Sequence, residues 1–375
     1  MQETFDTDVN PVDYFINKSY DRWNYRSYDR KKRSSISFYS LIFNQPQMIG
    51  YFSVNEYREF VPDASQLRYL KMPQSQNVRL DLNDGLKEFR PKPESVKREK
   101  MDFFLRFIVN NMNRFRVNGG FGSRGKLLTP DIICSRGRLV QIMCPQYTTD
   151  KKWSLLVSKY KGNVYICQPD GDDFHTIQTA YGFKFEQYLL SENPLDDPVT
   201  DVPVIESEEF YGVFESGIGN ISLLYNAEMD GLDSSVAVDL AEADFNQLKF
   251  VELKTCLGPS DSRHCRWWAH TFLAGISEVT VGHRTREGIV TRIENLPIDF
   301  LKSQADANWS PAKCIELLKT FLNYVLWICR NEDSPHTVYK FDYDCKLNRT
   351  IQCTIFRGKN EYSFLPDWYL NETSA

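Results

Sequence analysis

Short apolar runs of strand length alternate along this chain with longer segments of helical periodicity. Four such runs lie close together and predict a β-rich centre, at 131–134, 139–143, 153–157 and 164–167. The turn Lys161-Gly-Asn163 joins the last two runs as a hairpin. Further strands are expected at 221–229, 248–254, 279–282, 337–341 and 352–356, and helices at 94–113, 182–190, 267–275 and 311–330. The irregular alternation predicts an α/β fold: a single mixed α/β domain with β-sheets flanked by helices.

The composition narrows the class of protein further. The 375 residues carry 45 Lys and Arg against 50 Asp and Glu, so a nucleic-acid partner needs a local basic patch. No apolar run approaches the roughly 18–20 residues of a membrane-spanning helix, and the first residues lack the pattern of a secretory signal, so no membrane partner is expected. The nine cysteines lack CxxC spacing and are expected to be reduced, buried thiols.

Residues 1–35 form a polar and basic N-terminal extension, and 36–375 are expected to form one domain. Basic residues between 22 and 33 are interleaved with Trp23, Tyr25 and Tyr28. This pattern is typical either of a nucleic-acid arm or nuclear import signal, or of a plain solvated extension. The run Arg30-Lys-Lys-Arg33 favours a nuclear location, with a cytoplasmic pool left open.

Two charged tripeptides stand inside apolar, strand-like segments. Because residues i and i+2 of a strand share a face, Glu228 lies beside Asp230, and Glu252 beside Lys254. Three carboxylates on one face need a cation, and oxygen ligands select a hard ion such as Mg²⁺ or Mn²⁺. Lys254 would then neutralise charge on a phosphate or hold a nucleophilic water. The alternative is a solvated charge ladder, which the apolar neighbours of Glu252 disfavour.

Other residues leave alternatives open. Glu186 is either a further metal ligand or a surface helix residue, and Arg136 either a phosphate clamp or a structural salt bridge. The spacing of Cys256, His264, Cys265 and His270 fits no zinc module. The pair Trp267-Trp268 is expected in the core rather than on a base-stacking surface.

The Asp/Glu … Glu-x-Lys arrangement resembles the PD-(D/E)xK nuclease active site, and the ordered motifs resemble the DXO family of decapping exoribonucleases. The motifs are found at 49–53, 57–59, 67–69, 81–86, 136–137, 182–186, 228–230, 252–254 and 267–273. The resemblance implies a PD-(D/E)xK-nuclease-like core and a hydrolase that acts on RNA 5′ ends. Its expected reactions are removal of incomplete or non-canonical caps, including NAD caps, release of 5′ pyrophosphate, and 5′→3′ exoribonuclease activity.

The resemblance also assigns roles to residues. Glu186, Glu228, Asp230, Glu252 and the Leu253 carbonyl would hold two Mg²⁺ or Mn²⁺ ions. Glu228, Asp230, Glu252 and Lys254 would form the catalytic set. The RNA 5′ end would contact these substrate-binding residues: Arg58, Glu99, Ser135, Arg136, Gly137, Glu228, Lys254 and His270. A nuclear 5′→3′ exoribonuclease is an expected protein partner.

The sequence departs from the family pattern at two of these positions. Ser135 replaces the usual Trp and His270 the usual Gln, which leaves cap preference and processivity open. A protonatable His270 would also make substrate affinity depend on pH. Two other functions remain open: a catalytically inactive relative that binds or protects RNA 5′ ends within an assembly, and a nuclease that cleaves DNA.

Overall fold

A computed structural model describes residues 3–4, 43–117, 125–145, 152–169, 177–258, 261–305, 309–344 and 351–374. The N-terminal extension predicted for 1–35, with its basic stretch, lies outside the described residues apart from 3–4. In the described ranges, none of the helices is long and apolar enough to cross a membrane.

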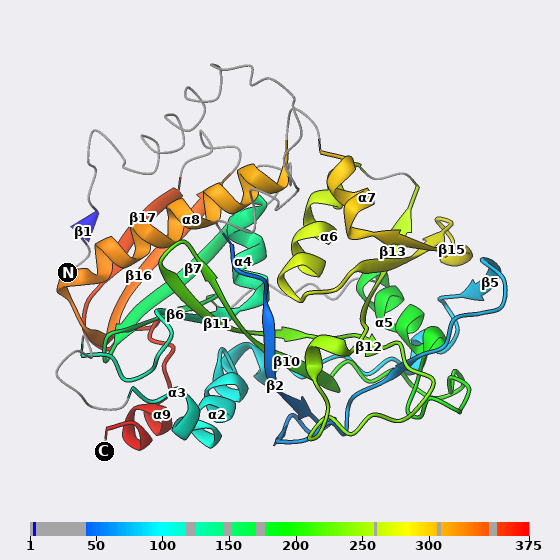
Figure 1. Cartoon of the computed structure of the whole chain (residues 1–375), viewed down its shortest axis with the longest axis horizontal. Helices are drawn as coiled ribbons and strands as arrows, with labels where there is room; N and C mark the ends of the chain where they lie inside the picture. Colours follow the sequence, from blue (N-terminus) through cyan, green and yellow to red (C-terminus); the bar gives the residue numbers. More distant parts are fainter. Residues whose placement is uncertain are drawn as a thin grey trace.

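The described strands form two mixed sheets (Figure 1). The larger sheet has the order β1 (Glu3–Thr4), β17 (Ile351–Phe356), β16 (Ser334–Asp344), β7 (Lys152–Tyr160), β8 (Asn163–Cys167), β6 (Ile132–Ser135), β11 (Ile221–Glu228), β10 (Glu209–Ile218), β2 (Gln47–Val54) and β3 (Phe60–Val61). The smaller sheet has the order β5 (Asn77–Asp81), β15 (Ile289–Pro297), β14 (Glu278–Arg284), β13 (Phe250–Leu257), β12 (Gly231–Leu232), β4 (Tyr69–Leu70) and β9 (Leu190–Ser191).

Helices cover both faces of the larger sheet. The helices are α2 (Asp102–Asn110), α3 (Met112–Phe115), α4 (Arg136–Met143), α5 (Ile177–Leu189), α6 (Asp261–Leu273), α7 (Ile298–Ser303), α8 (Pro311–Ile328) and α9 (Asp367–Glu372), with 3₁₀ turns η2 (Leu86–Glu88), η3 (Glu94–Arg98), η5 (Phe245–Gln247) and η6 (Cys329–Asn331). Ile132 belongs to the hydrophobic cluster that contains residues of α4, α6 and α8, whereas its neighbour Ile133 belongs to the cluster with residues of α2 and α9, as expected for opposite faces of the strand. The mixed α/β fold with flanking helices is therefore confirmed.

The predicted hairpin is confirmed, with a two-residue turn between β7 and β8. Tyr160 pairs with Asn163, and Lys161 and Gly162 both have positive φ, at 46° and 76°. Positive φ at both turn positions matches the right-handed twist of the paired strands.

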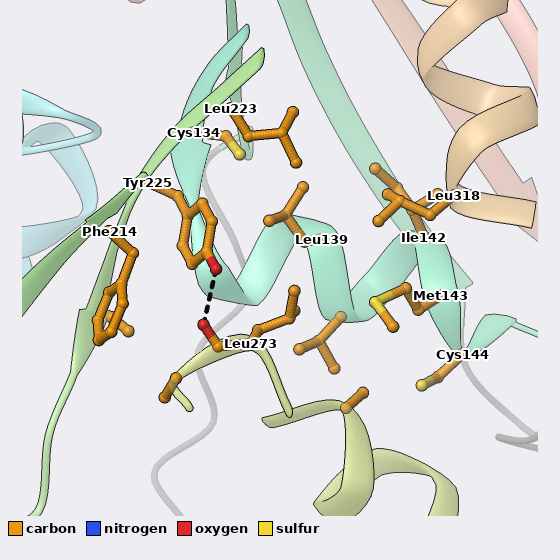
Figure 2. Close-up of a cluster of buried hydrophobic side chains, with 14 of the residues drawn as sticks. Cys134, Leu139, Ile142, Met143, Cys144, Phe214, Leu223, Tyr225, Leu273 and Leu318 are labelled. Carbon is orange, nitrogen blue, oxygen red and sulfur yellow. Dashed lines mark hydrogen bonds between the residues drawn. The ribbon is translucent and has the colours of Figure 1, made fainter. Parts of the chain in front are cut away.

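The prediction of a strand at 139–143 is wrong, because this run belongs to α4. Leu139, Ile142 and Met143 are buried between the larger sheet and the helices α6 and α8 (Figure 2). A short helix packed on several sides shows no polar face, so its apolar run has no periodicity that separates it from a buried strand.

The helix predicted over 94–113 is broken into η3, α2 and α3. The break after η3 falls near Lys100, whose φ of 49° lies in the left-handed region. That conformation is strained for a residue with a side chain, and Lys100 lines a cavity of about 240 Å³ together with Arg58 and Glu99.

Candidate active site

The predicted acidic residues lie where the chain passes from one sheet to the other. Strand β11 of the larger sheet ends at Glu228, and the Met229 amide donates a hydrogen bond of 2.9 Å to the Phe210 carbonyl. Gly231 then opens β12 in the smaller sheet, where it pairs with Val251 of β13. Asp230 therefore sits at the crossing point, beside the strand that carries Glu252 and Lys254.

Lys254 stands between two of the predicted carboxylates. Its Nζ lies 2.8 Å from Glu252 Oε1 and 3.6 Å from Asp230 Oδ2. It also donates a 2.8 Å hydrogen bond to the Leu253 carbonyl, while the Leu253 amide donates one of 2.6 Å to Asp230 Oδ2. The predicted pairing of Glu252 with Lys254 on one strand face is thus present, and Asp230 completes a compact charged group.

Arg136 forms a buried ion pair at the same centre. Its Nη1 lies 2.9 Å from Glu252 Oε2, and its Nη2 donates a 3.0 Å hydrogen bond to the Glu228 carbonyl. His270 Nδ1 is 3.5 Å from Glu252 Oε1 on the other side. The structure therefore shows Arg136 in a salt bridge, which is one of the two interpretations of this residue. Its contact with a substrate phosphate stays a prediction.

Ser135 and Gly137 flank Arg136 at the start of α4. Ser135 is the N-cap residue and lines a cavity of about 240 Å³ together with Arg58 and Glu99. A Cβ at Gly137 would lie 4.0 Å from the Ser135 hydroxyl oxygen. Both residues thus lie next to the site, although their predicted contact with substrate stays a prediction.

Glu186 is brought to the site by helix α5. It lines one pocket of about 330 Å³ together with Glu228 and Asp230. The helix approaches the smaller sheet closely because Gly282 of β14 has no side chain, and a Cβ there would lie 2.6 Å from the Phe185 ring. Glu186 is therefore partly buried beside Glu228 and Asp230, and its role as a metal ligand stays a prediction.

Partial burial and neighbouring carboxylates raise the pKa of Glu186, Glu228 and Asp230. Burial raises the pKa of Glu228 to about 7, with a further contribution from Glu209 that Lys92 opposes. Burial together with nearby carboxylates also raises the pKa of Glu186 and of Asp230. Burial acts in the same direction on Glu252, but Arg136 and Lys254 outweigh it and lower the pKa of that residue. The pocket therefore carries more negative charge than its cations balance.

This excess charge and the all-oxygen donor set fit a hard divalent cation. The four carboxylates lie in the same region of the molecule. No three of them, however, bring their oxygen atoms as close together as ligands of a single ion. Within the described part of the chain, only Cys144, Cys265 and Cys314 place three ligand atoms within 4.8 Å of one another. Arg136 and Lys254 instead hold Glu252 by ion pairs, as expected when cationic side chains balance buried carboxylates.

Arg58 and Glu99 form a second charged group beside the carboxylates. The Arg58 guanidinium donates to both oxygens of Glu99, at 3.1 and 2.6 Å, and lies 2.6 Å from Glu209 Oε2. Arg58 has a φ of 60°, and its turn is fixed by the Asn55 side chain, which accepts hydrogen bonds from the amides of Tyr57 and Glu59. Strained backbone of this kind occurs at positions that the surrounding structure holds in place.

Sequence reasoning missed two residues of this group, Glu209 and Lys92. Glu209 begins strand β10 with a side chain only 2% exposed, and it forms ion pairs with both Arg58 and Lys92. The available signal was a carboxylate directly preceding the apolar run of β10.

The residues considered for a soft metal do not gather in one place. Cys265 lies 3.4 Å from Cys144 and 3.6 Å from Cys314, His270 lies beside Glu252, and Cys256 contacts His283. Cys256, Cys265 and His270 thus have different neighbours. Trp267 and Trp268 are buried in the core, as expected.

Comparisons with known proteins agree with this geometry. Residues 44–370 match the family model described as RAI1 like PD-(D/E)XK nuclease. The chain is 32% identical over 346 residues to the decapping and exoribonuclease protein Rai1 of Drosophila melanogaster, covering 87% of this chain and 90% of the relative. It is 26% identical to the human decapping and exoribonuclease protein over 349 residues, which cover 88% of this chain and 85% of the relative.

Solved structures of the same family share the fold. Rai1 of Scheffersomyces stipitis, in complex with (3′-NADP)⁺ and calcium ion, aligns with a TM-score of 0.74 at 19% identity over 89% of this chain and 96% of that one. Rai1 of Candida albicans, in complex with pU5-Mn²⁺, aligns with a TM-score of 0.71 at 18% identity over 88% of this chain and 95% of that one. The chain therefore belongs to the Rai1-like family of PD-(D/E)XK nucleases.

Proposed function

We propose that this protein is a metal-dependent hydrolase of RNA 5′ ends. It removes non-canonical or incomplete caps, including NAD caps, releases 5′ pyrophosphate and degrades the RNA body 5′→3′. The names of the relatives support decapping and exoribonuclease chemistry, and a pU5-Mn²⁺ complex of one relative supports RNA and a divalent ion as ligands. The observation that carries the proposal is one pocket lined by the partly buried Glu186, Glu228 and Asp230, in which Asp230 lies beside Lys254 and the buried Glu252.

The carboxylates and the Leu253 carbonyl are the proposed ligands of two Mg²⁺ or Mn²⁺ ions. Ions bound there supply Lewis-acid charge and lower the pKa of a coordinated water. The pKa of Lys254 is lowered by burial, but Asp230, Glu252 and Glu186 outweigh this and raise it. Lys254 therefore stays protonated, and its charge stabilises negative charge that develops on a phosphate oxygen.

His270 acts as a neutral hydrogen-bonding group in this proposal. Burial and the nearby Arg136 hold its pKa well below the usual value, with Glu252 opposing them. The imidazole is therefore uncharged at neutral pH, and its replacement of the family's glutamine keeps one hydrogen bond to the RNA 5′ end.

We also propose a nuclear location and a nuclear 5′→3′ exoribonuclease as partner. The basic run Arg30-Lys-Lys-Arg33 supports the first, and the resemblance to the family supports the second. Imaging of the tagged chain with and without this run, and co-purification with the exoribonuclease, test the two parts separately.

The hydrolase proposal is tested on RNAs with one body and different 5′ ends. The purified protein with Mn²⁺ or Mg²⁺ should release products from triphosphorylated, NAD-capped and incompletely capped RNA. The double variant Glu228→Ala, Asp230→Ala should be folded and lose activity by at least about 10³-fold, because half of the carboxylate group is gone.

Two results would overturn the proposal. A folded protein that binds these RNAs without releasing any product would be an RNA-end binder. Equal rates on single-stranded DNA of the same sequence would make it a nuclease without RNA specificity.

A further inference from the structure

Three buried cysteine side chains meet where helix α4 packs against α6 and α8. Cys144 is the C-cap residue of α4, Cys265 lies in α6, and Cys314 lies near the start of α8. Figure 2 shows Cys144 at the end of α4, among the buried side chains of this region. Each of the three residues is no more than 4% exposed. Three separate helices therefore bring one thiol each to a common buried point, here called the thiol cluster.

The sulfur atoms of the thiol cluster are spaced like the ligands of one metal ion. Cys265 Sγ lies 3.4 Å from Cys144 Sγ and 3.6 Å from Cys314 Sγ. All three sulfur atoms lie within 4.8 Å of one another. With metal–sulfur bonds of about 2.3 Å, the sulfur ligands of a tetrahedral ion are about 3.8 Å apart. Small side-chain movements would therefore suffice to seat an ion among the three thiols.

The chemistry of these donors selects a soft ion. Thiolate sulfur prefers Zn²⁺ or Cu(I), whereas the carboxylates of the candidate active site prefer Mg²⁺ or Mn²⁺. Cysteine binds a metal as the thiolate, so an ion that enters the thiol cluster displaces the thiol protons. The positive charges of Arg266 and Lys313 favour the thiolates of Cys144 and Cys314, respectively. These charges also help to balance the net negative charge of three thiolates around one Zn²⁺ or Cu(I).

The alternative is that the three cysteines pack only as small apolar side chains, as buried cysteines commonly do. A thiol is a weak donor and a weak acceptor, so contacts among three thiols contribute little to stability. Packing therefore gives no reason for three sulfur atoms to converge from three helices, whereas metal binding requires that convergence.

We propose that Cys144, Cys265 and Cys314 bind one soft metal ion, Zn²⁺ or Cu(I), as three thiolates. The ion ties α4, α6 and α8 together at the point where they pack. This site is separate in its donors from the carboxylate group, so the protein binds a soft ion and hard ions at different places. The inference does not depend on the proposed hydrolase activity.

The thiol cluster is linked through two helices to the candidate active site. Helix α4 begins with Arg136 and ends next to Cys144, and α6 carries both Cys265 and His270. Arg136 and His270 both contact Glu252, at 2.9 and 3.5 Å. An ion in the thiol cluster therefore fixes the two helices that deliver these contacts, which makes its role structural.

The test is soft-metal binding by the reduced protein with Mg²⁺ in excess, so that Mg²⁺ occupies the carboxylates. Zn²⁺ and Cu(I) are titrated separately against a coloured chelator, without oxygen or added thiols. One equivalent of at least one of the two ions should bind, and the titrations show which ion is preferred. X-ray absorption of the zinc-loaded or copper-loaded protein should show three sulfur neighbours, at about 2.3 Å for Zn²⁺.

Alanine variants connect the bound ion to the thiol cluster. Cys314→Ala should weaken binding by at least about 100-fold, because loss of even a hydrogen-bond partner of a metal ligand costs roughly 10–100-fold. Cys144→Ala repeats the test on another helix, and thermal melting without metal shows which variants are folded. Cys329→Ala is the matched control, since it removes an equally buried thiol outside the thiol cluster and should leave the affinity unchanged.

A further variant separates this site from the carboxylates. Glu228→Ala with Asp230→Ala should bind the soft ion as tightly as the wild type, because neither residue belongs to the thiol cluster. Loss of soft-ion binding in that variant would place the ion at the carboxylates and overturn the inference. Failure of the reduced wild type to bind either ion would overturn it as well, as would unchanged affinity in folded Cys314→Ala or Cys144→Ala.

Discussion

At the scale of single residues, the balance between Arg136 and Glu252 decides the charge of the site. Both side chains are buried, at 8% and 1% exposure, and Glu252 also contacts Lys254 and His270. A pair like this stabilises the fold little as a unit, but removal of one partner leaves a buried charge with less compensation. Arg136 is therefore a residue on which stability and substrate chemistry both depend.

Arg136→Ala should lower the free energy of unfolding of the metal-free protein by roughly 3–5 kcal/mol. Chemical denaturation measures this loss, and Mn²⁺ should recover part of it, because an added cation can replace the missing guanidinium charge beside Glu252. Arg357→Ala is the control, since its pair with Glu332 at 3.3 Å is half exposed and such pairs contribute about 0–1 kcal/mol. A loss in Arg136→Ala no larger than in the control would contradict the buried pair.

The pairing of Glu252 with Lys254 was predictable from the sequence because its geometry is local. The i, i+2 spacing in a strand placed Glu252 with Lys254, and the apolar neighbours indicated burial. Glu209 and Lys92 were missed because the partners of Glu209, Arg58 and Lys92, lie 151 and 117 residues away from it in the sequence, on other elements. Such long-range ion pairs leave no spacing in a single sequence.

At the scale of elements, the packing of α5 on β14 fixes the position of Glu186. Phe185 is fully buried and fills the space above Gly282, where a Cβ would lie 2.6 Å from its ring. The next residue along α5 is Glu186, so a displacement of the helix also moves a proposed metal ligand.

Gly282→Ala should destabilise the protein by roughly 1–3 kcal/mol through overpacking and should weaken Mn²⁺ binding, because α5 has to move. Phe185→Leu provides the second site of a double-mutant cycle, since it removes ring atoms at the point of contact. The loss of stability in the double variant should be smaller than the sum of the losses in the two single variants. Its Mn²⁺ affinity should be higher than that of Gly282→Ala. Fully additive losses of stability, measured by denaturation, would show that the contact between Phe185 and Gly282 does not fix the position of α5.

The type of an element was predictable where the hydrophobic periodicity was clear. The prediction failed where burial on several sides removed that periodicity. Helix α8 was expected over 311–330 and is found at Pro311–Ile328, because its exposed face alternates with its buried one. The run at 139–143 gave the wrong element because α4 is covered by the sheet, α6 and α8. The break between η3 and α2 could not be predicted either, since it depends on a strained Lys100 that only the tertiary structure holds in place.

At the scale of the whole molecule, the site joins the two sheets. Glu228 closes β11 of the larger sheet, Glu252 lies in β13 of the smaller one, and Arg136 connects them by binding both. An ion held by carboxylates from both sheets would therefore bind the folded molecule and not the unfolded chain. Under that condition ligand binding adds directly to the stability of the entire fold.

The size of this effect sets the last prediction. At a free Mn²⁺ concentration of 100 times the dissociation constant, binding adds about 2.7 kcal/mol. With an unfolding entropy of about 2.1 cal/mol/K per residue over 375 residues, the melting temperature should rise by roughly 3 °C. The variant Glu228→Ala, Asp230→Ala should show no such rise, and Na⁺ at equal ionic strength should not replace Mn²⁺. A wild-type shift that persists in the double variant would place the bound ion elsewhere, because only a cation at the sheet junction depends on these two carboxylates.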